Sequence, residues 1–129
     1  MYPVKSHMAI LRLVKKEIIS HVITSNIDAL HAMSGIPADK LTELNGNTKS
    51  EFCEVCKIVY LRDFNVRNFA ADLEILNTGR HCDKGNTNCE FGLLKNCKCD
   101  HGETCSVIEG EPLEILKDAD VVISLGFMY

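Results

Sequence analysis

The first twenty residues carry apolar side chains at helical spacing. Leu11, Val14 and Ile18 lie three or four positions apart, and lysines occupy the opposite side of the stretch. We therefore expect a helix over residues 6–19 with Ser6 as its N-cap. The charges also interrupt the apolar residues too often for a signal peptide or a membrane span, so we expect a protein that is not exported.

The pattern then changes to short β-branched runs separated by polar residues. Residues 21–24, HVIT, predict a buried strand, and the polar residues that follow predict a loop at its carboxyl end. Residues 37–44, PADKLTEL, fit one or two helical turns that begin near Pro37 and end at an Asn-Gly turn. This order of helix, strand and loop is typical of α/β proteins.

The same pattern returns after a cysteine-bearing middle segment. Within that segment, residues 57–66 alternate in part like a strand, and residues 77–89 predict a loop. Beyond it, residues 110–119 predict a short helix with Pro112 in its first turn, and residues 120–126, DVVISLG, predict a second strand. Because helix-strand units flank the cysteines, the sequence predicts an α/β fold with a Cys-rich insertion.

Composition and charge narrow the class of protein. The chain has 129 residues, 46% of them hydrophobic, which is the size and composition of one soluble domain. Its net charge of −4 gives no basic field for nucleic acid or an anionic membrane. Seven cysteines without a secretory signal indicate a reducing compartment, where cysteine more often binds metal than forms disulfides.

The cysteine spacing predicts a zinc site. Cys53 and Cys56 form a Cys-x2-Cys pair, and Cys82 with Cys89, a looser Cys-x6-Cys pair, is the candidate for the other two ligands. The alternatives within NCKCDHGETC are Cys97, Cys99 and Cys105, which would replace Cys89, bind metal with His101, or remain free surface thiols. A four-thiolate site is closed to water, so its role would be structural.

Several motifs in one order resemble the sirtuins, NAD-dependent protein deacylases. Residues 24–35, TSNIDALHAMSG, are followed by LNGN and Cys-x-x-Cys, where the family has TQNIDGLH, SG, LHGN and Cys-x-x-Cys. TGRHC and ADVVISLG are similar to the class IV nuclear branch. The resemblance implies a partial Rossmann-like parallel sheet over 1–52 and 107–129, with a zinc-binding module over 53–106.

The resemblance also implies cofactors, a partner and site residues. Asn26 and Asp28 stand where sirtuins contact NAD, Ser25 replaces a Gln, and Gly126 opens the segment in the place of the family's GTSL. Zinc would be bound by the four cysteines at 53, 56, 82 and 89. The implied substrate is an acylated lysine in a histone-like protein, and the implied location is the nucleus.

Asn45 differs from the sirtuin motif at the position of the catalytic residue. The resemblance places the family's catalytic His, a general base, where this chain has Asn45. An amide does not usefully accept a proton, and loss of a general base costs about 10²- to 10⁴-fold in rate. The chain also begins in the helix that follows the family's Gly-rich NAD loop. We therefore expect a deacetylase with impaired catalysis. The alternative is a non-catalytic zinc module that binds other proteins. In either case, an exposed sheet edge would favour self-association.

Overall fold

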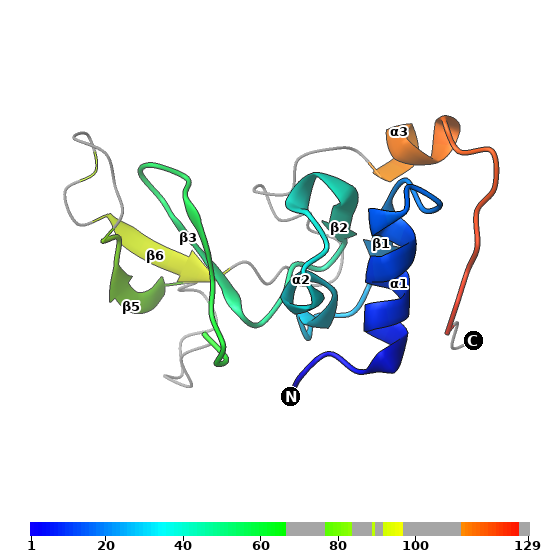
Figure 1. Ribbon diagram of the computed structural model, residues 1–129. Helices are drawn as coiled ribbons and strands as arrows, with labels where there is room; N and C mark the ends of the chain where they lie inside the picture. Colours follow the sequence, from blue (N-terminus) through cyan, green and yellow to red (C-terminus); the bar gives the residue numbers. More distant parts are fainter. Residues whose placement is uncertain (67–76, 84–88, 90–91, 97–111, 127–129) are drawn as a thin grey trace.

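The computed structural model describes residues 1–66, 77–83, 89, 92–96 and 112–126. The elements in chain order are α1 (Lys5–Lys15), β1 (Val22–Thr24), α2 (Leu30–Ser34), the 3₁₀ helix η1 (Ala38–Lys40), β2 (Leu41–Glu43), β3 (Ser50–Cys53), β4 (Val59–Leu61), β5 (Asn77–His81), β6 (Leu93–Asn96) and α3 (Pro112–Lys117). Helices and the β1–β2 pair form one part of the molecule, and β3 to β6 form the other (Figure 1). This is a mixed α/β fold.

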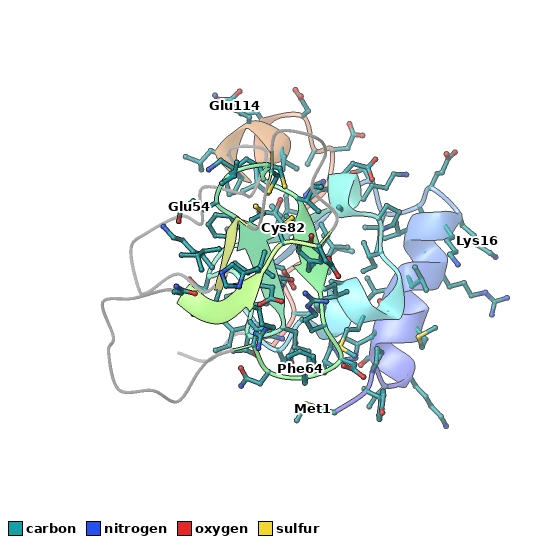
Figure 2. All side chains as sticks on the ribbon, turned by 90° about the vertical axis from the view of Figure 1, so that its left-hand side faces the viewer. Met1, Lys16, Glu54, Phe64, Cys82 and Glu114 are labelled. Carbon is teal, nitrogen blue, oxygen red and sulfur yellow. The ribbon has the colours of Figure 1, made fainter. Side chains whose placement is uncertain are left out.

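Helix α1 packs through one apolar side. Leu11 and Val14 are buried, whereas Lys16, just beyond the helix, projects away from the rest of the molecule (Figure 2). Burial of these two side chains fixes α1 against the α2 region, since the Leu11 side chain reaches Gly35. No helix in the described part of the chain has the length and apolar character that crossing a bilayer requires.

The boundaries of α1 differ from the prediction. Val4, and not Ser6, is the N-cap, and the Val4 N–H donates to Nδ1 of His7 at 3.3 Å. The helix ends at Lys15, four residues before the predicted end, because Glu17 adopts a left-handed conformation with φ of 58°. The Glu17 backbone turns the chain out of the helix and toward β1.

Strands β1 and β2 form a short parallel pair. Val22 pairs with Leu41 and Thr24 with Glu43, so the strand predicted at 21–24 is confirmed, although it is half-buried rather than buried. The helical prediction for 37–44 is correct for η1 and wrong for β2. Pairing with β1 supplies backbone hydrogen bonds that overrule the local helical preference. The loops after both strands therefore leave the same edge.

The other part is an antiparallel sheet with strand order β4-β3-β6-β5. Its core consists of Cys53, Tyr60, Cys82, Cys89 and Leu94. The partial strand predicted at 57–66 is confirmed by β4. The loop predicted at 77–89 is wrong for β5, where Gly79 has a φ of 74° and the register with β6 shifts; tertiary pairing overrides the weak strand propensity of this sequence.

Helix α3 confirms the helix predicted around Pro112, but the strand predicted after it is wrong. Residues 121–125 form no strand, and their apolar side chains are exposed; Ile123, for example, is 74% exposed. A strand requires a neighbouring strand for its hydrogen bonds, and this segment pairs with none among the described residues. In Figure 1 it is the extended trace that descends from α3 toward the C-terminus.

Candidate functional site

Four cysteine side chains converge at one end of the antiparallel sheet. The Sγ atoms of Cys53, Cys56, Cys82 and Cys89 all lie within 4.8 Å of one another. The distance from Cys53 to Cys89 is 3.4 Å, and that from Cys56 to Cys82 is 3.6 Å. Cys82 lies in the interior of the strand-rich part (Figure 2). The alternative residues Cys97, Cys99, His101 and Cys105 lie outside the described residues.

Two hairpin-like connections position these cysteines. Cys53 ends β3, and a tight turn brings Cys56 back toward it, with Lys57 in a left-handed conformation and its N–H bonded to the Cys53 carbonyl at 3.0 Å. Cys82 follows β5 directly, and its N–H donates to the carbonyl of Gly92 at 2.8 Å. Backbone hydrogen bonds at the ends of β3 and β5 thus hold Cys53 and Cys82 in place.

The sulfur geometry fits a metal ion better than disulfides. A disulfide requires an S–S distance of about 2.05 Å, and the four cysteines are free thiols. A Zn–S bond of about 2.3 Å in a tetrahedron implies sulfur spacings of about 3.8 Å, close to the 3.4 and 3.6 Å observed. The soft, four-sulfur donor set therefore suggests zinc in a closed, structural site.

The surroundings of Cys53 favour the ionised form of its thiol. Burial raises the pKa of Cys53, but hydrogen bonds from the backbone of Cys56 and Val55 and from the Cys89 thiol outweigh it and hold that pKa below the usual range. The hydrogen bond with the Cys53 sulfur, together with burial, raises the pKa of Cys89 to about 12. Metal binding would therefore displace protons from the other thiols.

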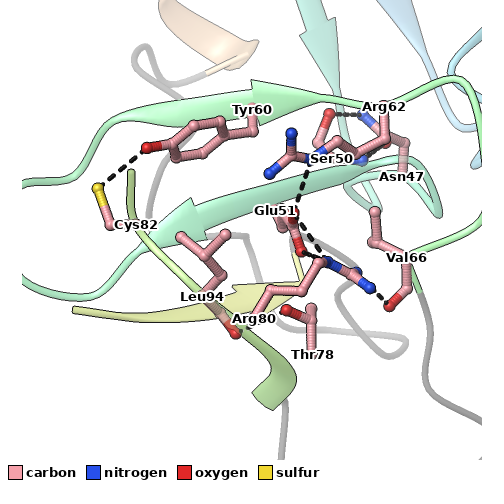
Figure 3. Close-up of polar contacts among 10 residues, drawn as sticks. All are labelled: Asn47, Ser50, Glu51, Tyr60, Arg62, Val66, Thr78, Arg80, Cys82 and Leu94. Carbon is pink, nitrogen blue, oxygen red and sulfur yellow. Dashed lines mark hydrogen bonds and ion pairs between the residues drawn. The ribbon is translucent and has the colours of Figure 1, made fainter. Parts of the chain in front are cut away.

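Beside the cysteines, Glu51 is the centre of a buried ion cluster. The Glu51 side chain has no exposed area and is bonded to Arg62 Nε at 2.7 Å and to Arg80 at 2.8 Å (Figure 3). Burial opposes ionisation of Glu51, but hydrogen bonds from Arg80, Thr78 and Arg62 outweigh it and lower its pKa. Arg62 directly follows β4, and Thr78 and Arg80 lie within β5, so the carboxylate joins β3, β4 and β5.

The loops after β1 and β2 bring the predicted NAD-pocket residues to one edge. Ser25 and Asn26 are exposed, and Asp28 is half-buried, where its Oδ1 accepts the Leu30 N–H at 3.0 Å. Thr48 of the second loop donates its backbone N–H to the Ile27 carbonyl of the first at 2.9 Å. The two loops are therefore bonded to each other at the carboxyl ends of parallel strands, where α/β proteins commonly bind ligands.

Asn45 lies in the loop after β2, at this edge, whereas Gly126 lies outside the two loops. The Asn45 Nδ2 donates to the Ser25 carbonyl at 3.0 Å, so its amide bridges the two loops. Gly126 is exposed, and a Cβ there would meet nothing within 4 Å. The structure thus brings together Ser25, Asp28 and Asn45 on neighbouring loops and leaves Gly126 in the exposed segment that follows α3.

Comparison with known proteins places the chain in a family. The family model described as "Sir2 family" matches residues 1–127. The chain belongs to the Sir2 family. This sirtuin is 36% identical over 125 residues to the NAD-dependent protein deacetylase SRT1 of Arabidopsis thaliana, covering 96% of this chain and 25% of SRT1. It is 34% identical over 132 residues to human NAD-dependent protein deacetylase sirtuin-7, covering 96% of this chain and 31% of that protein.

The sirtuin therefore spans about a quarter to a third of the curated relatives named here. Among solved structures, a Sir2 bound to an acetylated peptide matches at 26% identity with a TM-score of 0.47, covering 90% of this chain and 41% of that one. A Sir2 homologue in complex with NAD matches at 23% identity with a TM-score of 0.46, covering 90% and 37%.

Sequence reasoning missed three residues that shape the cysteine cluster and its surroundings. Glu51 lies in β3, a strand that the sequence does not predict and in which every residue is buried. Tyr60 is the buried centre of β4, where the sequence predicts a partial strand but not which residue faces the cysteines. Gly92 lies so close to the cluster that a Cβ would stand 2.6 Å from Cys53 Sγ and 3.1 Å from Cys89 Sγ. A glycine three residues after a candidate ligand was the available signal.

Proposed function

We propose that this sirtuin functions in NAD-dependent deacylation of protein lysines and that Cys53, Cys56, Cys82 and Cys89 hold a structural zinc. The observation that carries the proposal is the Sir2 match over residues 1–127 in a chain whose four cysteines converge. Zinc here would stabilise the antiparallel sheet, because the cluster forms its core. We propose the same division as the sequence predicts: residues 1–52 and 107–129 around a zinc-binding module at 53–106.

The loop residues have separate proposed roles. Ser25, Asn26 and Asp28 would orient the nicotinamide and ribose of NAD, and Gly126 would approach the cofactor from the segment after α3. When bound, NAD supplies the ADP-ribose to which the acyl group is transferred. The proposed substrate is an acylated lysine of a histone-like nuclear protein. The loops after β1 and β2 leave the carboxyl ends of a parallel pair of strands, and this position supports the roles proposed for their residues.

Turnover by this chain is proposed to be slow. Asn45 occupies the position of the family's proton acceptor, and its amide hydrogen already bonds to the Ser25 carbonyl. A neutral amide offers no group that takes a proton near pH 7. The same observation favours a second candidate function, a non-catalytic sirtuin module that binds other proteins.

Nicotinamide release tests the proposal. The zinc-loaded chain and its Asn45→His variant are incubated with NAD and an acetyl-lysine peptide, and nicotinamide is measured by mass spectrometry. We expect the variant to exceed the unmodified chain by about 10²-fold, the lower range for a general base. Ser20→His, which adds an imidazole at an exposed site, is the matched control.

The other outcomes of this experiment bear on the role of position 45 and on the choice between the two functions. Equal release by the unmodified chain and Asn45→His would contradict the assignment of position 45. Absence of release from both, with no NAD binding by calorimetry, would favour the non-catalytic module. Zinc content is measured on the same samples, so that failure of the metal site is recognised separately.

A further inference from the structure

Tyr60 occupies the central position of β4 and points into the cysteine cluster. Its side chain is 4% exposed, while its neighbours Val59 and Leu61 are 49% and 46% exposed. The alternation places Tyr60 on the inner face, in the same core as Leu94 and three of the cysteines. A buried phenol hydroxyl requires a hydrogen-bond partner.

The partner is a cysteine of the candidate metal centre. The Tyr60 hydroxyl oxygen lies 3.0 Å from Cys82 Sγ (Figure 3). A cysteine that binds a divalent metal is a thiolate and carries no proton. In the loaded site the direction of this hydrogen bond is therefore fixed: the tyrosine hydroxyl donates, and the sulfur accepts.

The other three sulfurs accept from the backbone. The Cys56 N–H lies 3.4 Å from Cys53 Sγ, and the backbone of Ile58 and of Gly92 bonds to the Cys56 and Cys89 sulfurs, respectively. A four-thiolate zinc site keeps a net negative charge, so each donor around it lowers the cost of burial. At Cys82 the Tyr60 hydroxyl is a donor from a side chain, which one substitution removes.

Tyr60 is itself held by the ion cluster. The Arg62 guanidinium carbon lies 4.7 Å from the centre of the Tyr60 ring, and Arg62 is in turn bonded to buried Glu51. A cation over the ring fixes its orientation and favours donation by the hydroxyl. The Glu51 cluster is thus linked through Arg62 and Tyr60 to the sulfur of Cys82 (Figure 3).

We propose that Tyr60 is a positioning residue of the metal centre, whose hydroxyl donates to the Cys82 thiolate and strengthens metal binding. The inference rests on the zinc site proposed above. Groups hydrogen-bonded to metal ligands typically contribute about 10- to 100-fold to metal affinity. Tyr60→Phe removes the hydroxyl and keeps the ring against Arg62, which makes it the appropriate variant.

The test compares Tyr60→Phe with Tyr2→Phe, the same change at a residue that is 79% exposed. Zinc affinity of the full chain is measured by chelator competition, and Co²⁺ is substituted to record the sulfur-to-metal charge-transfer band. We expect Tyr60→Phe to bind zinc about 10- to 100-fold more weakly. Its Co²⁺ band should move to longer wavelength, because a thiolate without the donor gives up electron density more readily.

The Co²⁺ band distinguishes the hydrogen bond from a loss of packing. A variant that was merely less stable would bind less Co²⁺ without a shift of the band, and that result would overturn the proposal, as would an affinity equal to that of Tyr2→Phe. If the unmodified chain bound neither zinc nor Co²⁺, both the proposed metal site and the role of Tyr60 would be wrong. Circular dichroism of the metal-free proteins checks that all variants fold alike.

Discussion

Gly92 shows how a single residue without a side chain shapes the cysteine cluster. Its missing Cβ leaves room for the sulfurs of Cys53 and Cys89, which would lie 2.6 and 3.1 Å from it. Real Cβ atoms do not approach a sulfur at 2.6 Å, so one of the two must move. Neither sulfur can move freely, because both belong to the cluster around which the sheet packs.

Gly92→Ala is therefore expected to weaken zinc binding by about 10-fold or more and to destabilise the metal-bound chain by about 1–3 kcal/mol, the range for overpacking. Zinc content by mass spectrometry and thermal unfolding measure the two effects. Ser20→Ala, a small change at an exposed residue between α1 and β1, is the control. Full zinc retention by Gly92→Ala would mean that the sulfurs are not held in the observed arrangement.

The two asparagines of the Asn45-Gly46-Asn47 turn have different environments. Asn47 is 3% exposed, and its Oδ1 accepts the backbone N–H groups of Lys49 and Ser50 at 2.8 and 2.6 Å. It stabilises the turn that leads into β3. Asn45 instead bridges to Ser25. The sequence drew attention to position 45, whereas the position that holds the turn is 47.

At the scale of elements, Glu51 joins strands that are distant in the sequence. Its carboxylate has no exposed area, but Arg62 and Arg80 are 27% and 34% exposed. Removing one partner of a fully buried ion pair costs about 3–5 kcal/mol. Because the arginines remain partly hydrated after Glu51→Gln, we expect a smaller loss of about 2–4 kcal/mol at pH 7, measured by denaturant unfolding.

The free energy of unfolding that Glu51→Gln loses should become smaller as the pH falls. The hydrogen-bonded arginines lower the folded-state pKa of Glu51, so its contribution is complete above the unfolded glutamate pKa of about 4.3. That contribution disappears as the pH falls through the lower folded-state pKa. The difference between Glu51→Gln and the unmodified chain should therefore narrow below about pH 4.3. A constant difference would contradict the ion cluster. Glu17→Gln, the same change at an exposed residue after α1, is the control, and zinc content is followed at each pH.

At the scale of the whole molecule, the segment after α3 presents adjacent apolar side chains to solvent. Val121, Val122, Ile123 and Leu125 are between 63% and 78% exposed. Exposed β-branched segments without a paired neighbour favour association with another chain. We therefore expect the chain to self-associate with rising concentration, as measured by analytical ultracentrifugation.

Val122→Lys should shift this association to higher concentration, because a charge disfavours pairing of the segment. Ser20→Lys adds the same charge at an exposed position before β1 and serves as the control. Equal association of both variants would place the interface elsewhere. A monomer at every concentration would mean that the segment does not mediate self-association.

The sequence by itself determined the features that depend on near neighbours: the α1 periodicity, the β-branched run of β1, the Pro112 helix and the Cys53–Cys56 turn. Tertiary structure alone decided the strands β2, β3, β5 and β6, because their backbone hydrogen bonds come from partners distant in the sequence. The same reason applies at the site. The sequence identifies the cysteines, but only the folded sheet brings Tyr60 and Gly92 against them and links Glu51 to Tyr60 through Arg62.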